Sequence, residues 1–169
     1  GDGLPELALA CEWGPVRLFQ NAAGQLRDAT VAWGLNTLTG WWSGLTAGDL
    51  NGDGRLDLVA GNWGLNSAYR TPDTEPLRLY YGDLQERGTV DLIEAEWDSA
   101  RKTDTPRHRL DFMANGLPWL QEQFPSFTAF SQATVTEVVG NAVARVATVE
   151  ARTLASGTFI NRGTNFAFT

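Results

Sequence analysis

Residues 49–57 read Asp-Leu-Asn-Gly-Asp-Gly-Arg-Leu-Asp, and this stretch determines how the rest of the chain is interpreted. Side chains that carry oxygen stand at alternate positions, at Asp49, Asn51 and Asp53. In a tight loop such side chains converge on one point, and Gly54 permits the sharp turn that follows them. The pattern therefore predicts a loop that can surround a cation.

Two positions after the turn extend this oxygen set. The backbone carbonyl near Arg55 can add an oxygen, and the carboxylate of Asp57, on the outgoing strand, can close the site in a bidentate manner. An all-oxygen set suits a hard cation of the Ca²⁺ type, which takes about six to eight ligands. We therefore expect a calcium site, and its candidate ligands are Asp49, Asn51, Asp53, Arg55 and Asp57.

Two other interpretations of this loop are considered. The helix-loop-helix calcium hand requires Glu at the twelfth loop position, which here is Ala60, so that fold is excluded. Clusters of Asp, Asn and Gly are also common in ordinary turns, so a loop without metal is the alternative. The calcium interpretation is favoured because Asp57 lies in an apolar strand, where an unpaired carboxylate would be costly, and because the loop recurs in the chain.

The recurrence is an internal repeat. Residues 1–7, Gly-Asp-Gly-Leu-Pro-Glu-Leu, align with residues 52–58, Gly-Asp-Gly-Arg-Leu-Asp-Leu, and a Trp-Gly pair follows each stretch. The N-terminal copy keeps Asp2 and Glu6 but lacks the first half of the motif, so its metal occupancy is left open.

A third, weaker copy covers residues 83–91. It keeps Asp83 and Asp91 but has Gln85 and Arg87 at the inner positions. The charge of Arg87 can replace that of a metal ion, and we therefore expect no metal in this copy.

Composition and spacing limit the fold class. The 169 residues are 43% hydrophobic, and short apolar runs of about five residues alternate with Gly- and Asn-rich turns, which favours an antiparallel meander of strands. The net charge of −7 argues against a nucleic-acid partner, because binding to a polyanion requires clustered Lys and Arg. No apolar run approaches the roughly 18 residues of a membrane span.

The spacing of apolar residues divides the chain into three parts. Strand spacing dominates residues 1–97, which we interpret as sheet units with the calcium loop. Residues 98–147 form an insertion, because residues 110–147 carry apolar side chains at helical spacing; Ser126 and Thr134 are candidate helix caps. Strand texture returns in residues 148–169, which we interpret as the start of a further sheet unit.

The loop and its flanks resemble a known repeat. Residues 49–58, preceded by Gly40-Trp-Trp-Ser-Gly-Leu-Thr-Ala-Gly48 and followed by Gly61-Asn-Trp-Gly-Leu-Asn-Ser67, are similar to the FG-GAP or VCBS repeats of integrin-alpha-like β-propellers. The similarity is strongest to bacterial secreted proteins related to cartilage acidic protein. Residues 106–134 resemble the helical insertion of those proteins.

The resemblance implies a mainly β fold, a partial β-propeller of antiparallel FG-GAP blades with a short-helix insertion. It places calcium in the loop between the first two strands of a blade, on Asp49, Asn51, Asp53 and Asp57. It also implies a fragment of a larger secreted, periplasmic or cell-surface protein, whose remaining blades or another subunit would cover the open sheet edges.

The sequence offers little for catalysis. His108 lies between two arginines, and the spacing leaves open a catalytic pair of His108 with the distant Cys11. The alternating acids Asp91, Glu94 and Glu96 are typical of a solvent-facing strand. We therefore expect no enzyme but a module for adhesion, or for protein or glycan binding and assembly. The alternative is part of a polysaccharide-active, lyase-like enzyme, which a basic, aromatic-lined cleft near carboxylates would favour.

The paired tryptophans Trp41 and Trp42 should point to opposite faces of a strand. One ring can then pack in the core, while the other approaches a partner or the calcium loop. Core packing is the default, and an exposed Trp could stack on a sugar ring.

Overall fold

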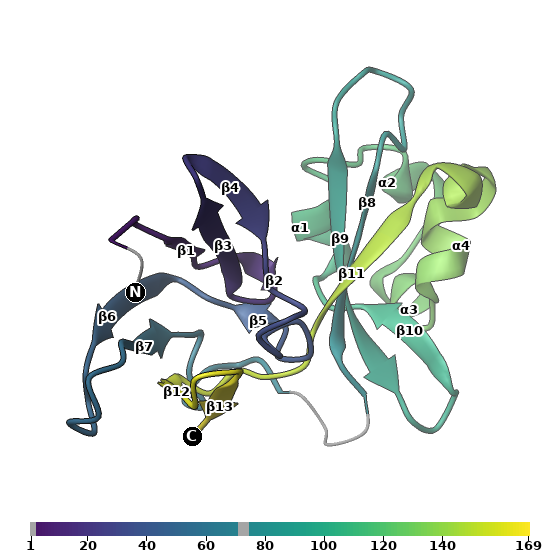
Figure 1. The fold of residues 1–169 in the computed structure, drawn as a ribbon. Coiled ribbons are helices and arrows are strands. Elements are labelled where there is room, and N and C mark those ends of the chain that lie inside the picture. The colour runs from purple at the N-terminus through teal and green to yellow at the C-terminus, as the bar shows by residue number, and fades with distance from the viewer. Residues whose placement is uncertain (1–2, 71–74) are drawn as a thin grey trace. The chain divides into compact units, whose positions relative to one another are not determined.

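The computed structural model describes residues 3–70 and 75–169, and it is mainly β (Figure 1). The described strands form four antiparallel sheets, and the few helices are short. The chain divides into two compact units, Gly1–Pro72 with Glu150–Thr169, and Asp73–Val149.

Residues 49–56 connect two strands of a four-stranded sheet in the first unit. The sheet has the order β13-β12-β7-β6, with β6 at Gly44–Gly48, β7 at Asp57–Gly61, β12 at Gly157–Asn161 and β13 at Phe166–Phe168. Strands β12 and β13 therefore complete the sheet that β6 and β7 begin. The interpretation of residues 148–169 as the start of a further sheet unit is corrected by this pairing.

A three-stranded sheet in the same unit follows the same plan. Its order is β1-β3-β4, with β1 at Leu7–Leu9, β3 at Arg17–Ala22 and β4 at Gln25–Asp28. Leu7 lies opposite Phe19 in register, and in the larger sheet Leu58 lies opposite Phe159. Since the repeat aligns Leu7 with Leu58, strands β1, β3 and β4 correspond to β7, β12 and β13.

A small ribbon and an aromatic core complete the first unit. Strand β2 (Glu12–Gly14) pairs with β5 (Gly40–Trp41). The rings of Trp42 and Phe159, each 1% exposed, meet edge to face at 5.4 Å in the hydrophobic cluster. Burial of large aromatic side chains is a main source of stability in a small β unit.

The second unit has its own sheet, with the order β10-β9-β8-β11. The bounds are β8 (Leu77–Gly82), β9 (Asp91–Asp98), β10 (Thr103–Pro106) and β11 (Ala147–Ala151). Strands β8 and β9 thus share a compact unit with the helices, whereas the sequence division at residue 97 separated them. Strand β10 lies in a polar stretch whose pattern did not predict it.

Short helices follow β10, as the helical spacing predicts. They are α1 (Leu110–Met113), α2 (Leu120–Gln123), α3 (Phe127–Ser131), α4 (Val135–Val139) and the 3-10 helix η1 (Gly140–Arg145). The caps are confirmed: the Ser126 hydroxyl accepts from Ala129 N–H, and Thr134 forms a capping box with Glu137.

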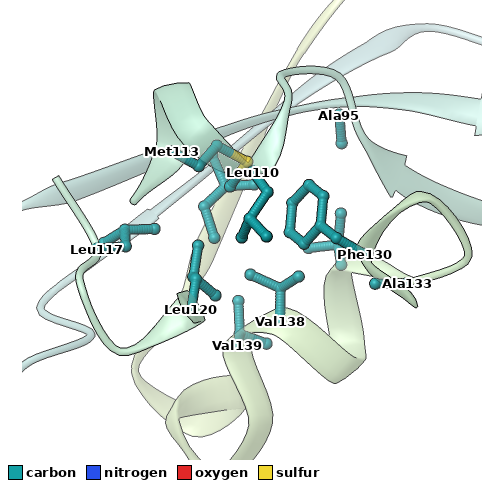
Figure 2. Packing of buried hydrophobic residues seen from close by; sticks show 11 residues of the cluster. Ala95, Leu110, Met113, Leu117, Leu120, Phe130, Ala133, Val138 and Val139 are labelled. Atoms are coloured by element: carbon teal, nitrogen blue, oxygen red, sulfur yellow. The ribbon is translucent and has the colours of Figure 1, made fainter. Parts of the chain in front are cut away.

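The helices bury their apolar residues against the sheet of the second unit. Figure 2 shows Leu110, Leu120, Phe130 and Val138 pointing toward one another from different helices, with Ala95 of β9 beside them. Leu120 is fully buried. The unit therefore has a hydrophobic core of its own.

Candidate functional site

The loop with the predicted ligands connects β6 to β7, whose pairing ends at Gly48 opposite Asp57 (Figure 1). Asp49 organises the loop: its Oδ1 accepts from the N–H groups of Gly52 and Asp53 at 2.8 and 3.1 Å, and its Oδ2 accepts from Gly54 N–H at 2.9 Å. These bonds stabilise the charged carboxylate and hold the pKa of Asp49 below its usual value, with the Gly54 bond as the main cause. Gly52 and Gly54 have φ of +76° and +81°, which explains glycine at both positions.

Asp57 is fully buried at the end of the hairpin. Its Oδ2 accepts from Leu50 N–H at 2.9 Å, and its Oδ1 accepts from Asn161 N–H of β12 at 2.8 Å. The cost of burying this carboxylate is therefore offset by two backbone donors. The argument that an unpaired Asp57 would need a metal is corrected here, because Asp57 has partners within the chain.

The middle of the loop is a network around Asp53. Its Oδ2 accepts from Asn51 Nδ2 at 2.9 Å and from the Arg55 guanidinium at 2.5 Å, and Asn51 Oδ1 accepts from Asp53 N–H at 3.0 Å. Arg55 also donates from Nε to the carbonyl of Asn161 at 3.0 Å. Arg55 thus contributes its side chain to this network, in addition to the carbonyl considered from the sequence.

The donor chemistry of the loop fits a hard cation. Three carboxylates and one amide offer side-chain oxygens, and the Asp57 carboxylate, with one N–H partner on each oxygen, retains lone pairs. The pair between Arg55 and Asp53 is 45% and 24% exposed, so a cation competes with a weak, solvated interaction. In residues 3–70 and 75–169, no three His, Cys, Asp or Glu side chains are gathered in a metal-binding group. The calcium site at Asp49, Asn51, Asp53, Arg55 and Asp57 stays a prediction.

The third copy of the motif has the same backbone arrangement. It connects β8 to β9, whose pairing ends at Gly82 opposite Asp91. Asp83 accepts from the N–H groups of Arg87 and Gly88 at 2.9 and 2.7 Å, as Asp49 does from Asp53 and Gly54. These bonds, with that from Arg87 N–H as the main cause, lower the pKa of Asp83.

The inner residues distinguish this loop from the first. Leu84 N–H donates to Asp91 Oδ2 at 3.1 Å, and Gln85 Nε2 donates to Asp91 Oδ1 at 2.9 Å. The Arg87 guanidinium lies 3.8 Å from the same Oδ1. The Arg87 guanidinium and the Gln85 amide therefore both face the Asp91 carboxylate. That this copy holds no metal stays a prediction.

The N-terminal copy is visible in part, since Asp2 lies outside the described residues and Glu6 is exposed. A shared contact still relates it to the middle copy. Asn21 Nδ2 donates to the carbonyl of Pro5 at 3.1 Å, and Asn161 Nδ2 donates to that of Leu56 at 3.1 Å. Sequence reasoning missed this role of Asn161, although its equivalence to Asn21 in the repeat was the available signal.

Trp41 and Trp42 lie in different surroundings, as the strand geometry predicts. Trp42 is buried in the core, whereas Trp41 contacts the rings of Trp13 and Trp63 at 5.7 and 4.4 Å. Trp63 in turn contacts Tyr69 at 3.5 Å. Trp41 and Trp63 are only partly buried, so this aromatic row in the first unit reaches solvent.

The candidate acid–base residues of β9 are paired with the segment after β10. Glu96 accepts from Arg107 at 2.9 Å, and Glu94 lies 3.1 Å from His108 Nε2. His108 also contacts the ring of Phe112. The third predicted acid, Asp91, belongs to the hairpin loop described above. Cys11 and His108 belong to different compact units.

A cleft of about 400 Å³ lies beside these pairs, within the second unit. One side comes from β9, β10 and the following arginines, and the other from α3. The lining residues are Glu96, Thr105, Pro106, Arg107, His108, Arg109, Leu110, Phe127, Phe130, Ser131 and Ala133. Sequence reasoning did not find this cleft, because its residues are scattered over three segments with no shared motif.

The fold and the hairpin loop define a mainly β chain with repeated sheets and an oxygen-rich loop at a hairpin end. Residues 1–60 match the model of the FG-GAP-like repeat family. This part of the chain therefore contains an FG-GAP-like repeat, which confirms the resemblance found in the sequence. The searches against curated proteins and solved structures gave no match.

Proposed function

We propose that the chain is a non-catalytic, calcium-binding segment of a β-propeller in a larger exported protein, and that it serves adhesion or protein and glycan binding and assembly. The proposal rests on the FG-GAP-like repeat at residues 1–60, since such repeats are typically found in extracellular proteins and are generally non-catalytic. Secretion, or a periplasmic or cell-surface location, is part of the proposal.

The observation that carries the calcium role is the oxygen-rich loop itself. Asp49, Asn51 and Asp53 stand on one tight turn, and the buried Asp57 fixes the end of β7 to β12. A cation bound there would stabilise both the turn and the strand pairing. Asp49, Asn51, Asp53 and Asp57 would supply side-chain oxygens, and Arg55 its carbonyl.

The sheets support the propeller part of the proposal. A four-stranded antiparallel meander, β6-β7-β12-β13, is the form of a propeller blade, and β1-β3-β4 repeats its last three strands. The edge strands of these sheets present backbone groups that seek partners. We propose that the remaining blades of the parent protein, or another subunit, pair with them.

Thermal melting tests the calcium role. Calcium at a hundredfold its dissociation constant should raise the stability by about 2.7 kcal/mol, and a chelator should reverse the shift. An unchanged midpoint in calcium and in chelator would contradict the proposal. Asp111→Asn, at an exposed pair in the second unit, serves as a control that should respond to calcium as the wild type does.

A second candidate, part of a polysaccharide-active enzyme, is favoured by the cleft of the second unit. It combines Arg107, Arg109 and two phenylalanines with Glu96, the kind of lining that such an enzyme would need. The candidate acid–base groups are, however, engaged in ion pairs, Glu96 with Arg107 and Glu94 with His108. Release of new reducing ends from a polysaccharide, abolished by Glu96→Gln, would favour the enzyme over the binding module.

The structure adds one observation on membranes. Among the helices of residues 3–70 and 75–169, none is long and apolar enough to cross a bilayer.

A further inference from the structure

The cleft of the second unit has a firm floor. Leu110 and Phe130 line it and also belong to the buried core, where Figure 2 shows Phe130 packed beside Leu110. They are 7% and 5% exposed. A volume of about 400 Å³ lies within the range of small-ligand sites, and a floor fixed by the core preserves its shape.

The charges around the cleft are balanced pair by pair. Arg107 donates to Glu96 at 2.9 Å, and Arg109 lies 3.2 Å from Asp111. The remaining pair joins His108 to Glu94 at 3.1 Å. A strongly charged ligand would compete with these internal partners. A neutral ligand with many hydroxyl groups would instead find donors and acceptors together, at no cost in unpaired charge.

An exposed ring stands at the same cleft. Phe127 is 58% exposed although it lines the cleft, and the Arg109 guanidinium lies 5.6 Å from its ring centroid. The C–H face of a sugar ring packs on such an aromatic surface, while its hydroxyls reach guanidinium and carboxylate groups. The hydroxyls of Thr105 and Ser131 add polar groups to the lining.

We infer that this cleft binds a neutral saccharide, with Phe127 as the stacking surface and with Arg107 and Glu96 as hydrogen-bonding groups. The inference rests on the proposed binding function and gives it a ligand class and a site. It places glycan recognition in the second unit and outside the matched repeat.

Isothermal titration of the full chain tests this inference. Cellotriose, xylotriose and maltotriose are the neutral probes, and trigalacturonate is the anionic comparator. At least one neutral probe should bind, and Phe127→Ala should weaken that binding about fivefold to tenfold. Glu96→Gln should weaken it as well, since the amide replaces an acceptor with a donor. Circular dichroism confirms that each variant is folded.

Tyr81→Ala is the matched control, because Tyr81 of the second unit is 37% exposed and does not line this cleft. It should bind as the wild type does. The inference is overturned if no neutral probe binds, if only trigalacturonate binds, or if Phe127→Ala binds as tightly as the wild type.

The same titrations in calcium and in chelator separate the two proposals. Saccharide binding without any response to calcium would contradict the calcium role alone. A calcium response without saccharide binding would contradict the cleft assignment alone.

Discussion

Leu58 of β7 lies directly opposite Phe159 of β12, although residues 59–158 separate them along the chain. In the equivalent sheet, Leu7 lies opposite Phe19 after a short connection. The compact unit Asp73–Val149 is therefore an insertion between the second and third strands of a repeated sheet. The repeat, rather than proximity in sequence, determines which strands pair.

Because the two sheets are equivalent, substitutions at Asn21 and at Asn161 should have similar effects on stability. The Asn161 side chain donates to the Leu56 carbonyl and accepts from Gly163 N–H at 2.8 Å. Asn161→Ala should lower the free energy of unfolding by about 1 kcal/mol, measured by denaturant titration.

Asn21→Ala should have a similar effect, since Asn21 makes the corresponding bonds to the Pro5 carbonyl and Gly24 N–H. Wild-type stability in both variants would show that these bonds do not connect the strands as described.

The loop of residues 83–91 should gain a calcium site through two substitutions. Gln85→Asn with Arg87→Asp restores at the inner positions the residue types of the first loop, while Asp83 and Asp91 stay in place. The double variant should gain a calcium site, measured by titration, and should lose stability in chelator because Asp91 loses its nearby cation. Arg87→Met should be destabilised without gaining calcium, and calcium binding by Arg87→Met would contradict this account of the loop.

The stability of the fold should depend on pH at the acid end because of Asp28. The Thr30 hydroxyl, followed by Arg17, lowers the pKa of Asp28 to about 2 from 3.8. A lowered pKa gives stability that is present above about pH 4 and is lost as the pH falls toward 2. Asp28→Asn should therefore make the loss of stability in this window shallower, measured by melting from pH 5 to pH 2. Identical pH profiles for the variant and the wild type would contradict this role of Asp28.

The sequence predicted most of the strands and the helical segment, because both depend on apolar spacing and on turn residues such as Gly54. It also predicted that Trp42 and Trp41 would differ in burial. It did not place β12 beside β7, since strand pairing over an insertion has no local signal. That pairing was available only through the similarity of Phe159 to Phe19 in the repeat.

The candidate site shows a similar limit. The oxygen-bearing residues of the loop were predicted from spacing, and Arg87 was predicted as a cation beside the acids of the third copy from its charge alone. The contact that satisfies Asp57 comes from Asn161, which is distant in sequence. The cleft around Phe127 depends on packing between β9, β10 and α3, and no sequence period records such packing.

Calcium stoichiometry tests the central claim most directly. Isothermal titration of calcium into metal-free chain should show binding, and Asp53→Ala should lower the number of calcium ions bound per chain by one while leaving the apolar strand pattern intact. Asp83→Ala lies in the other loop, where Arg87 supplies a positive charge near Asp91. It is the matched control and should retain the site at residues 49–57. No binding by the wild-type chain, or equal binding by Asp53→Ala, would contradict the claim that residues 49–57 hold calcium.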